Sequence, residues 1–316
     1  MPHVESHYSP NPYYLNNRHL ETILPSVFNK VNGVAYRRER LELEDGDFLD
    51  LDWLNNQNKR IMILSHGMEG SSHRAYVKRF AKYFYDKGWD ILAWNYRSCS
   101  GEMNRLPKFY DYGNTYDFST VVDHALSKPY RQIVLVGFSM GGGLTIKYLG
   151  THKINDRISH GIAFSVSCDL KDSATEVEKP KHIIYNKSFI NKLKTKLRRK
   201  AEQFDEFKKI PIGSIKSFNE FNRNYSLPFH NFKTLDEFYQ ASSSGPHIQK
   251  IRVPTLMVNA LNDPILGIKC YPFKAAEDNP NFFLETPKQG GHLGFMLKGN
   301  PFSYMELRAE EFILSN

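Results

Sequence analysis

The sequence predicts an α/β protein, a mostly parallel twisted sheet flanked by helices, with a helical cap inserted late in the chain. Three observations lead to this prediction. Short, almost wholly apolar runs, typical of strands buried on both faces, alternate with segments of helical spacing. A pattern typical of an antiparallel hairpin precedes the first of these runs. A lysine-rich and then aromatic stretch at 170–249 interrupts the alternation.

The chain begins with a segment for which we predict no regular structure. Pro10, Pro12 and Pro25 all fall within the first thirty residues. Because proline removes a backbone donor and restricts its neighbour, this spacing favours an irregular arm that crosses the surface.

Strand and helix patterns then follow in order. Two alternating runs separated by an acidic turn that contains glycine, 34–43 and 48–54, predict the hairpin. We predict buried strands at 60–65, 89–96, 132–137, 162–166, 255–260 and 281–285. We predict helices at 77–84, 115–126, 139–149 and 301–314. This order is typical of a mostly parallel sheet that is covered on both faces.

The length favours a single domain, residues 1–316. A chain of this size can bury one large core, but it is too short for two ordinary domains and a long linker. We place the core at approximately 30–169 and 250–316, and the cap insertion at approximately 170–249.

The composition excludes several classes of protein. No segment reaches the roughly 20 apolar residues that a membrane span needs, and the first residues lack the pattern of a signal peptide. The three cysteines match neither a disulfide framework nor a zinc site. We therefore expect a cytoplasmic protein without a metal or cofactor. The net charge of +8 favours either anionic partners or a basic solvated surface, and no motif points to nucleic acid.

The most informative motif is Gly137-Phe138-Ser139-Met140-Gly141. It follows a predicted buried strand and opens a predicted helix, where a sharp turn leaves room only for small flanking residues. The helix N-terminus also directs free N–H groups to this point and favours negative charge. In this context we predict that Ser139 is a nucleophile; the same letters elsewhere would indicate a plain glycine-rich connection.

Two later loops supply a candidate acid and a candidate base. Asp263 follows a predicted strand, although its position before proline would also suit a simple turn, and Glu277 and Asp278 are competing acids. His292 lies in a glycine-rich loop after the last predicted strand, and such a loop can bring an imidazole to the serine. A histidine that takes the serine proton, oriented by a carboxylate, makes the hydroxyl reactive.

The loop at 66–70 is a candidate oxyanion hole. We predict that the backbone N–H of Met68 acts there together with the backbone N–H of Met140. The alternative is a plain strand-to-helix loop. His66 precedes the nucleophile, and His292 is the better placed base.

Six segments together resemble one family. They are H-G-M-E-G-S-S at 66–72, N-Y-R-S-C-S-G-E-M-N-R at 95–105, Y-D-Y-G-N-T-Y-D at 110–117, G-F-S-M-G-G at 137–142, P-T-L-M-V-N-A-L-N-D-P at 254–264 and G-G-H-L-G-F at 290–295. The chain is similar, over nearly its whole length, to the YheT-like or EMB8-type branch of the α/β-hydrolase fold superfamily, which is related to the abhydrolase-domain lipases and esterases. Ser98 stands where that family usually has glycine.

The resemblance implies a function and assigns roles. It implies a serine-dependent carboxylic-ester hydrolase that acts on short- to medium-chain acyl esters or acylglycerols through an acyl-enzyme, without a cofactor. It places the catalytic roles on Ser139, Asp263 and His292. The alternatives are a thioesterase or amidase that uses the same triad, and a catalytically silent hydrolase fold that only binds.

Two charged segments have open interpretations. Polar residues of the segment 95–117 could brace the site through internal ion pairs or bind a polar head group; they are Arg97, Glu102, Asn104, Arg105 and Asp117. A basic cap helix predicted at about 182–200 could make weak contact with an anionic membrane surface or simply pack its apolar stripe on the core. Its cations are Lys192, Lys194, Lys196, Arg198, Arg199 and Lys200.

Overall fold

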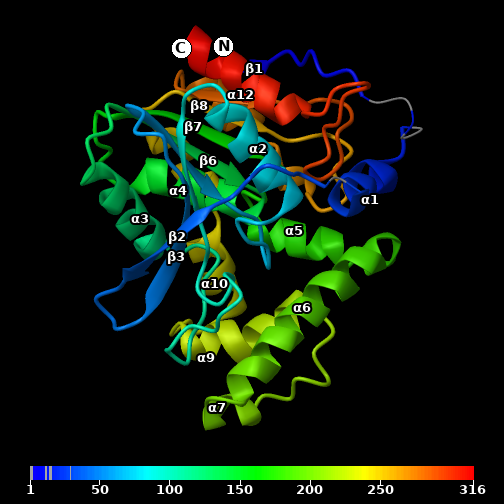
Figure 1. Cartoon of the computed structure of the whole chain (residues 1–316). Helices are drawn as coiled ribbons and strands as arrows, with labels where there is room; N and C mark the ends of the chain where they lie inside the picture. Colours follow the sequence, from blue (N-terminus) through cyan, green and yellow to red (C-terminus); the bar gives the residue numbers. More distant parts are fainter. Residues whose placement is uncertain (1–2, 11–12, 14–15, 29) are drawn as a thin grey trace.

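A nine-stranded sheet forms the centre of the protein (Figure 1). The structure is a computed structural model that describes residues 3–10, 13, 16–28 and 30–316. The strand order is β1-β9-β8-β7-β6-β4-β5-β3-β2. The strands are β1 His3–Val4, β2 Arg37–Glu42, β3 Phe48–Leu54, β4 Arg60–Ser65, β5 Asp90–Trp94, β6 Gln132–Phe138, β7 Ile158–Phe164, β8 Thr255–Val258 and β9 Phe282–Glu285.

Every neighbouring pair is parallel except β2 with β3 and β3 with β5. The predicted hairpin is thus present at one edge of a mostly parallel sheet. The predicted α/β-hydrolase fold class is confirmed, and the carboxyl ends of the parallel strands meet along one edge, where loops after strands carry functional groups in such sheets.

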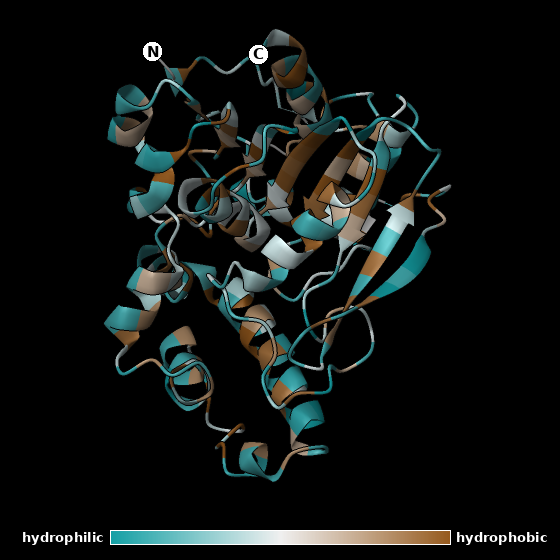
Figure 2. Ribbon diagram, turned by 90° about the vertical axis from the view of Figure 1, so that its left-hand side faces the viewer, coloured by the Kyte–Doolittle hydropathy of each residue, from teal (hydrophilic) through white to brown (hydrophobic). Residues whose placement is uncertain are grey.

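Helices cover both faces of the sheet. The core helices are α2 Ala75–Tyr85, α3 Tyr116–Leu126, α4 Met140–Thr151, α11 Phe273–Asp278 and α12 Tyr304–Ser315. Alternate residues of a central strand belong to different cores: Ile61 and Ile63 pack toward α3 and α4, whereas Met62 and Leu64 pack toward α2 and α12. Burial on both faces explains the continuous apolar runs, and Figure 2 shows the middle strands coloured as hydrophobic along most of their length.

The segment between β7 and β8 is helical and lies beside the sheet, at the opposite end from the chain termini in Figure 1. Its helices are α5 Leu170–Val177, α6 Ile183–Ala201, α7 Asp205–Lys208, α8 Phe218–Phe221, α9 Leu227–Phe229 and α10 Leu235–Ser242. Its apolar residues join the core under one face of the sheet; for example, Tyr225 stacks on Phe109 with ring centroids 4.1 Å apart. The burial of such aromatic pairs stabilises the packing of the cap against the sheet domain.

The prediction of an irregular N-terminal arm was wrong for two stretches. His3 and Val4 form β1, which pairs in parallel with β9, and α1 spans Arg18–Phe28 with Pro25 inside it. The prolines favoured a prediction of irregular structure, but the segment forms a helix that packs against a loop near the other end of the chain, and this packing stabilises it. Pro12 lies outside the described residues.

Candidate active site

Ser139 lies on the sharp turn between β6 and α4. Its φ of 55° places a non-glycine residue in the left-handed region, a strain that persists only where the surroundings impose it. A Cβ on Gly137 would lie 2.2 Å from the carbonyl oxygen of Gly141, and one on Gly141 would lie 2.2 Å from that of Ser65. The close approach of three backbone segments therefore requires both glycines of the motif.

The structure brings Ser139, Asp263 and His292 into one hydrogen-bonded chain. His292 Nε2 lies 3.0 Å from Ser139 Oγ, and His292 Nδ1 lies 2.8 Å from Asp263 Oδ2. The Asp263 side chain is completely buried, and its other oxygen accepts the backbone N–H of Ile265 at 2.9 Å. This arrangement allows the imidazole to take the serine proton while the carboxylate holds the Nδ1–H.

The competing acids lie elsewhere. Glu277 and Asp278 are on α11, and both pair with Lys274. Only Asp263, among the three candidates, contacts His292 in the structure. The loops after β8 and β9 carry the candidate acid and the candidate base, as predicted from their positions after strands.

Met68 and Met140 border the same cavity as Ser139. Met140 is the first residue of α4, where a backbone N–H has no acceptor within the helix. The loop that contains Met68 approaches the serine closely, since a Cβ on Gly67 would lie 3.2 Å from Ser139 Cβ. The structure thus brings Met68 and Met140 to the cavity of Ser139, and their role as oxyanion-hole donors stays a prediction.

His66 is a structural histidine. Its Nδ1 donates to the carbonyl of Gly67 at 2.7 Å, and its Nε2 accepts the backbone N–H of Tyr96 at 3.4 Å. Complete burial lowers the pKa of His66 to about 3, so the ring is neutral at physiological pH. Both ring nitrogens are engaged, which leaves His292 as the histidine that faces the serine.

Two hollows meet at Ser139. The apolar cavity lies between the serine and the cap and has a volume of about 80 Å³. Its main apolar lining residues are Met68, Ala174, Val177, Phe189, Phe218, Phe238 and Ile265. The entrance cleft opens on the side of His292, and residues of α1, α2 and α6 contribute to it; those used below are Val27, Arg74, Ile184 and Lys192.

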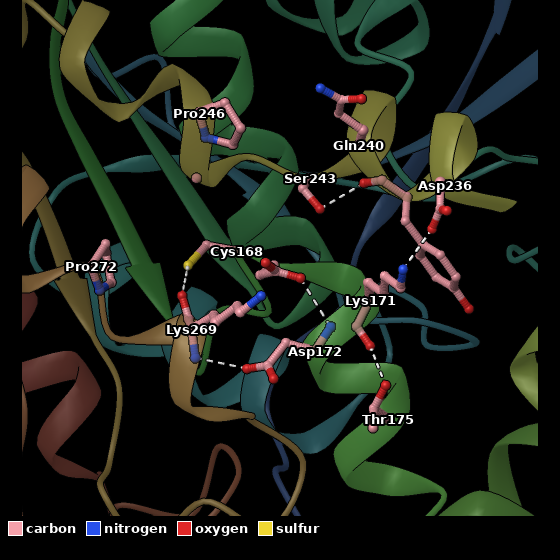
Figure 3. Close-up of a pocket in the computed structure, with 13 residues that line it drawn as sticks. Cys168, Lys171, Asp172, Thr175, Asp236, Gln240, Ser243, Pro246, Lys269 and Pro272 are labelled. Atoms are coloured by element: carbon pink, nitrogen blue, oxygen red, sulfur yellow. Dashed lines mark hydrogen bonds and ion pairs between the residues drawn. The ribbon is translucent and has the colours of Figure 1, made fainter.

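A third hollow, shown in Figure 3, is separate from Ser139 and His292 and lies between α5, α10 and the loop before α11. Two of its charged side chains pair with each other, Lys171 with Asp236 at 2.6 Å, and the carboxylate of Asp172 accepts the backbone N–H of Lys269 at 2.7 Å. These groups are satisfied within the protein, and the hollow shares no lining residue with the entrance cleft.

Arg97, Asn104 and Asp117 of the segment 95–117 join an internal network, whereas Glu102 and Arg105 form ion pairs at the surface. Arg97 is almost completely buried and donates to the carboxylates of Asp45, Asp47 and Asp117. Asn104 donates to the same Asp47 at 2.6 Å. Ser98 has a φ of 61°, which explains why glycine would suit that position.

The basic cap helix is only partly available to an outside partner. Lys196 is buried and pairs with Glu69 at 2.7 Å, and Lys200 is buried and donates to the carbonyl of Asn104 at 2.8 Å. Burial lowers the pKa of Lys200 to about 8. Lys192, Arg198 and Arg199 are exposed.

The described part of the chain contains no group of three or more residues arranged to hold a metal ion. Within the same residues, no helix is long and apolar enough to cross a membrane.

Proteins that carry a serine on such a strand-to-helix turn, at the carboxyl edge of a sheet with this topology, form the α/β-hydrolase class, and this chain is one of them. Within that class it belongs to the Hydrolase_4 family, described as serine aminopeptidase S33, whose profile matches residues 56–269. The predicted resemblance to YheT-like and EMB8-type proteins is confirmed.

Several proteins are similar along most of this chain. YheT of Escherichia coli (strain K12), named provisionally as an esterase, is 28% identical over 89% of this chain and 85% of its own length. Human phospholipase ABHD3 is 26% identical over 99% of this chain and 80% of its own length. The chain is thus an esterase- and phospholipase-like α/β hydrolase.

Solved structures share the fold. The esterase Pf2001 of Pyrococcus furiosus has a TM-score of 0.60 at 15% identity and covers 99% of this chain and 96% of its own. The mouse α/β hydrolase domain-containing protein 10 has a TM-score of 0.58 at 13% identity, over 88% of this chain and 99% of its own.

Proposed function

We propose that the protein hydrolyses carboxylic esters of short- to medium-chain acids through an acyl-enzyme on Ser139. The observation that carries the proposal is the hydrogen-bonded chain from Ser139 through His292 to Asp263, with distances of 3.0 and 2.8 Å. These are hydrogen-bond distances that a nucleophile and its base need.

The reaction proceeds in two halves. Ser139 Oγ attacks the acyl carbonyl while its proton passes to His292 Nε2, and the N–H groups of Met68 and Met140 stabilise the tetrahedral oxyanion. The intermediate collapses, and His292 returns the proton to the departing alcohol oxygen. Water then attacks the acyl-serine as His292 takes its proton, and His292 passes this proton to Ser139 Oγ as the acyl–Oγ bond breaks and the acid is released. No cofactor takes part in these steps.

The two hollows at Ser139 suggest where the halves of the ester bind. The apolar cavity suits the acyl chain, because its cap-derived side chains offer little hydrogen bonding. The entrance cleft suits the alcohol half, because it is open and lies on the side of His292, which must protonate the departing oxygen.

We expect Ala174→Phe to shorten the range of accepted acyl chains. Ala174 on α5 lines the apolar cavity, so a benzyl group there removes space for the chain end. The ratio of octanoate to acetate hydrolysis should fall about tenfold or more, measured as kcat/KM with p-nitrophenyl esters. Thr175→Phe is the matched control, since Thr175 lines the third hollow instead. An unchanged ratio in Ala174→Phe would place the acyl chain elsewhere.

Matched substrates test the reaction itself. We expect an ester to be cleaved faster than a thioester or amide of the same acyl group, and we expect a fluorophosphonate probe to label the protein. Faster amide cleavage would favour the peptidase-type activity that the family's description names. Failure to label, with no turnover of any of the three, would favour a silent binding fold.

We also propose that the mouth of the entrance cleft makes weak contact with anionic membrane surfaces. Val27 on α1 and Ile184 on α6 line the cleft and are 61% and 68% exposed. Arg74 and Lys192 supply positive charge, and none of the described lining residues is acidic. Exposed apolar side chains flanked by cations are typical of interfacial binding.

Vesicle co-sedimentation tests this contact. We expect more protein on vesicles that contain phosphatidylglycerol than on phosphatidylcholine alone, and we expect Lys192→Glu to reduce the difference. Lys274→Glu on α11 is the matched control, because Lys274 lines neither hollow at Ser139. Equal sedimentation with both vesicle types would rule the contact out.

A further inference from the structure

The loop that carries His292 depends on partners outside itself. Its backbone adopts left-handed conformations at Gly291, Leu293 and Phe295, with φ values of 57°, 58° and 45°. Non-glycine residues in this region are strained, and such a loop keeps its shape only when neighbouring groups hold it. The position of the imidazole opposite Ser139 and Asp263 therefore depends on the residues that hold this loop.

Helix α1 supplies two of these partners. Glu21 is 1% exposed, and its Oε2 accepts the backbone N–H of Gly290 at 3.0 Å. Thr22 Oγ1 accepts the backbone N–H of His292 itself at 3.0 Å. Helix and loop are also in tight contact, since a Cβ on Gly294 would lie 2.2 Å from the Glu21 carbonyl oxygen.

The same carboxylate oxygen also holds the loop of the acid. Glu21 Oε2 accepts from Asn262 Nδ2 at 2.7 Å, and Asn262 is the residue before Asp263. Asn262 Oδ1 in turn accepts the backbone N–H of Gly291 at 3.0 Å. One buried carboxylate thus links the acid loop and the base loop.

We propose that Glu21 is a positioning residue that sets the alignment of His292 with Asp263 and Ser139. This proposal rests on the hydrolase function proposed above. Loss of the carboxylate leaves the buried N–H of Gly290 and the half-buried side-chain amide of Asn262 without their acceptor, so the two loops separate or rotate. A displacement of about 1 Å between catalytic groups lowers turnover by about a hundredfold.

At position 21, one substitution can remove the negative charge and keep the two hydrogen bonds, and another can remove both. Glu21 Oε1 is buried and has no hydrogen-bond partner, whereas Oε2 makes both contacts. Glutamine can place its oxygen at Oε2 and its amide nitrogen at Oε1. Glu21→Gln therefore keeps both contacts, and Glu21→Ala removes both.

The test compares these variants by kinetics and by spectroscopy. We expect Glu21→Ala to lower kcat for p-nitrophenyl butyrate about a hundredfold with KM changed less than threefold, and Glu21→Gln to stay within threefold of the unmodified protein in both. The proton between His292 Nδ1 and Asp263 Oδ2 is followed by its low-field ¹H NMR resonance, which needs no substrate. This resonance should be lost or shifted in Glu21→Ala and retained in Glu21→Gln.

Two further variants serve as a substitute for Glu21→Ala and as a control. If Glu21→Ala does not fold, Thr22→Val removes the acceptor of the His292 N–H without changing side-chain shape and should move the same resonance. Glu285→Gln alters a completely buried carboxylate that binds Arg308 and lines neither hollow, and should leave kcat and the resonance unchanged. An unchanged resonance together with an unchanged kcat in Glu21→Ala would overturn the proposal. If Glu21→Ala does not fold, the same result in Thr22→Val would overturn it. Absence of turnover in the unmodified protein would count against the hydrolase function instead, and the resonance would still decide the role of Glu21.

Discussion

Replacing Ser139 by alanine is expected to lower kcat for p-nitrophenyl butyrate by about 10⁴- to 10⁶-fold. In the proposed mechanism this hydroxyl forms the acyl-enzyme, and His292 Nε2 lies 3.0 Å from it, in position to take its proton. The fold should be retained, because alanine fits the same strained backbone and the surrounding glycines remain. Labelling by a fluorophosphonate should disappear together with turnover.

Two further variants test whether the loss of activity is specific to Ser139. Ser127→Ala, at the exposed end of α3, should keep full activity and labelling. Combining Ser139→Ala with His292→Ala should cost little more than Ser139→Ala alone, because residues that act as one unit have non-additive effects. Hydrolysis that survives in Ser139→Ala would show that another residue is the nucleophile.

Replacing Arg97 by methionine is expected to lower the free energy of unfolding by about 3–5 kcal/mol. Arg97 is 5% exposed and holds three carboxylates, of which the Asp47 side chain is completely buried. Burial alone would raise the pKa of Asp47, but hydrogen bonds from Asn104 and from backbone N–H groups, together with the charge of Arg97, hold it below its ordinary value. Without Arg97 a buried negative charge loses its counter-ion.

The same segment provides the matched control. Arg105 pairs with Glu42, and both side chains are about half exposed. Arg105→Met should therefore lower the free energy of unfolding, measured by urea denaturation, far less than Arg97→Met does. A similarly small cost for Arg97→Met would contradict the bracing role and would return the segment to the alternative of a head-group site.

Much of the fold could be predicted because its signals are local. Strands buried on both faces are apolar at most positions, and the turn at Ser139 tolerates only glycine on either side. The ends of the strands were predicted less accurately. The strand predicted at 89–96 is Asp90–Trp94, and the hairpin strand predicted at 34–43 is Arg37–Glu42. Pairing with a neighbouring strand, rather than residue type, sets these ends.

The helix α1 could not be predicted in the same way. Pro25 lies inside it, and its role depends on residues almost 270 positions away, such as Gly290, which bonds to Glu21. The cations of α6 present the same difficulty. Lys196 and Lys200 look like solvated charges in the sequence, yet both are buried against loops that contain Glu69 and Asn104.

The sequence by itself determined the fold class, the succession of most strands and helices along the chain, and the candidates for the nucleophile, acid and base of a hydrolase mechanism. These follow from periodicity, from the sterics of one turn and from motifs whose letters are contiguous. Only the tertiary structure decided that Asp263 rather than a nearby acid faces His292, which cations remain exposed, and that α1 closes on the base loop. The physical reason is that hydrogen bonds and burial between distant segments leave no local pattern in the chain, whereas backbone sterics and strand burial do.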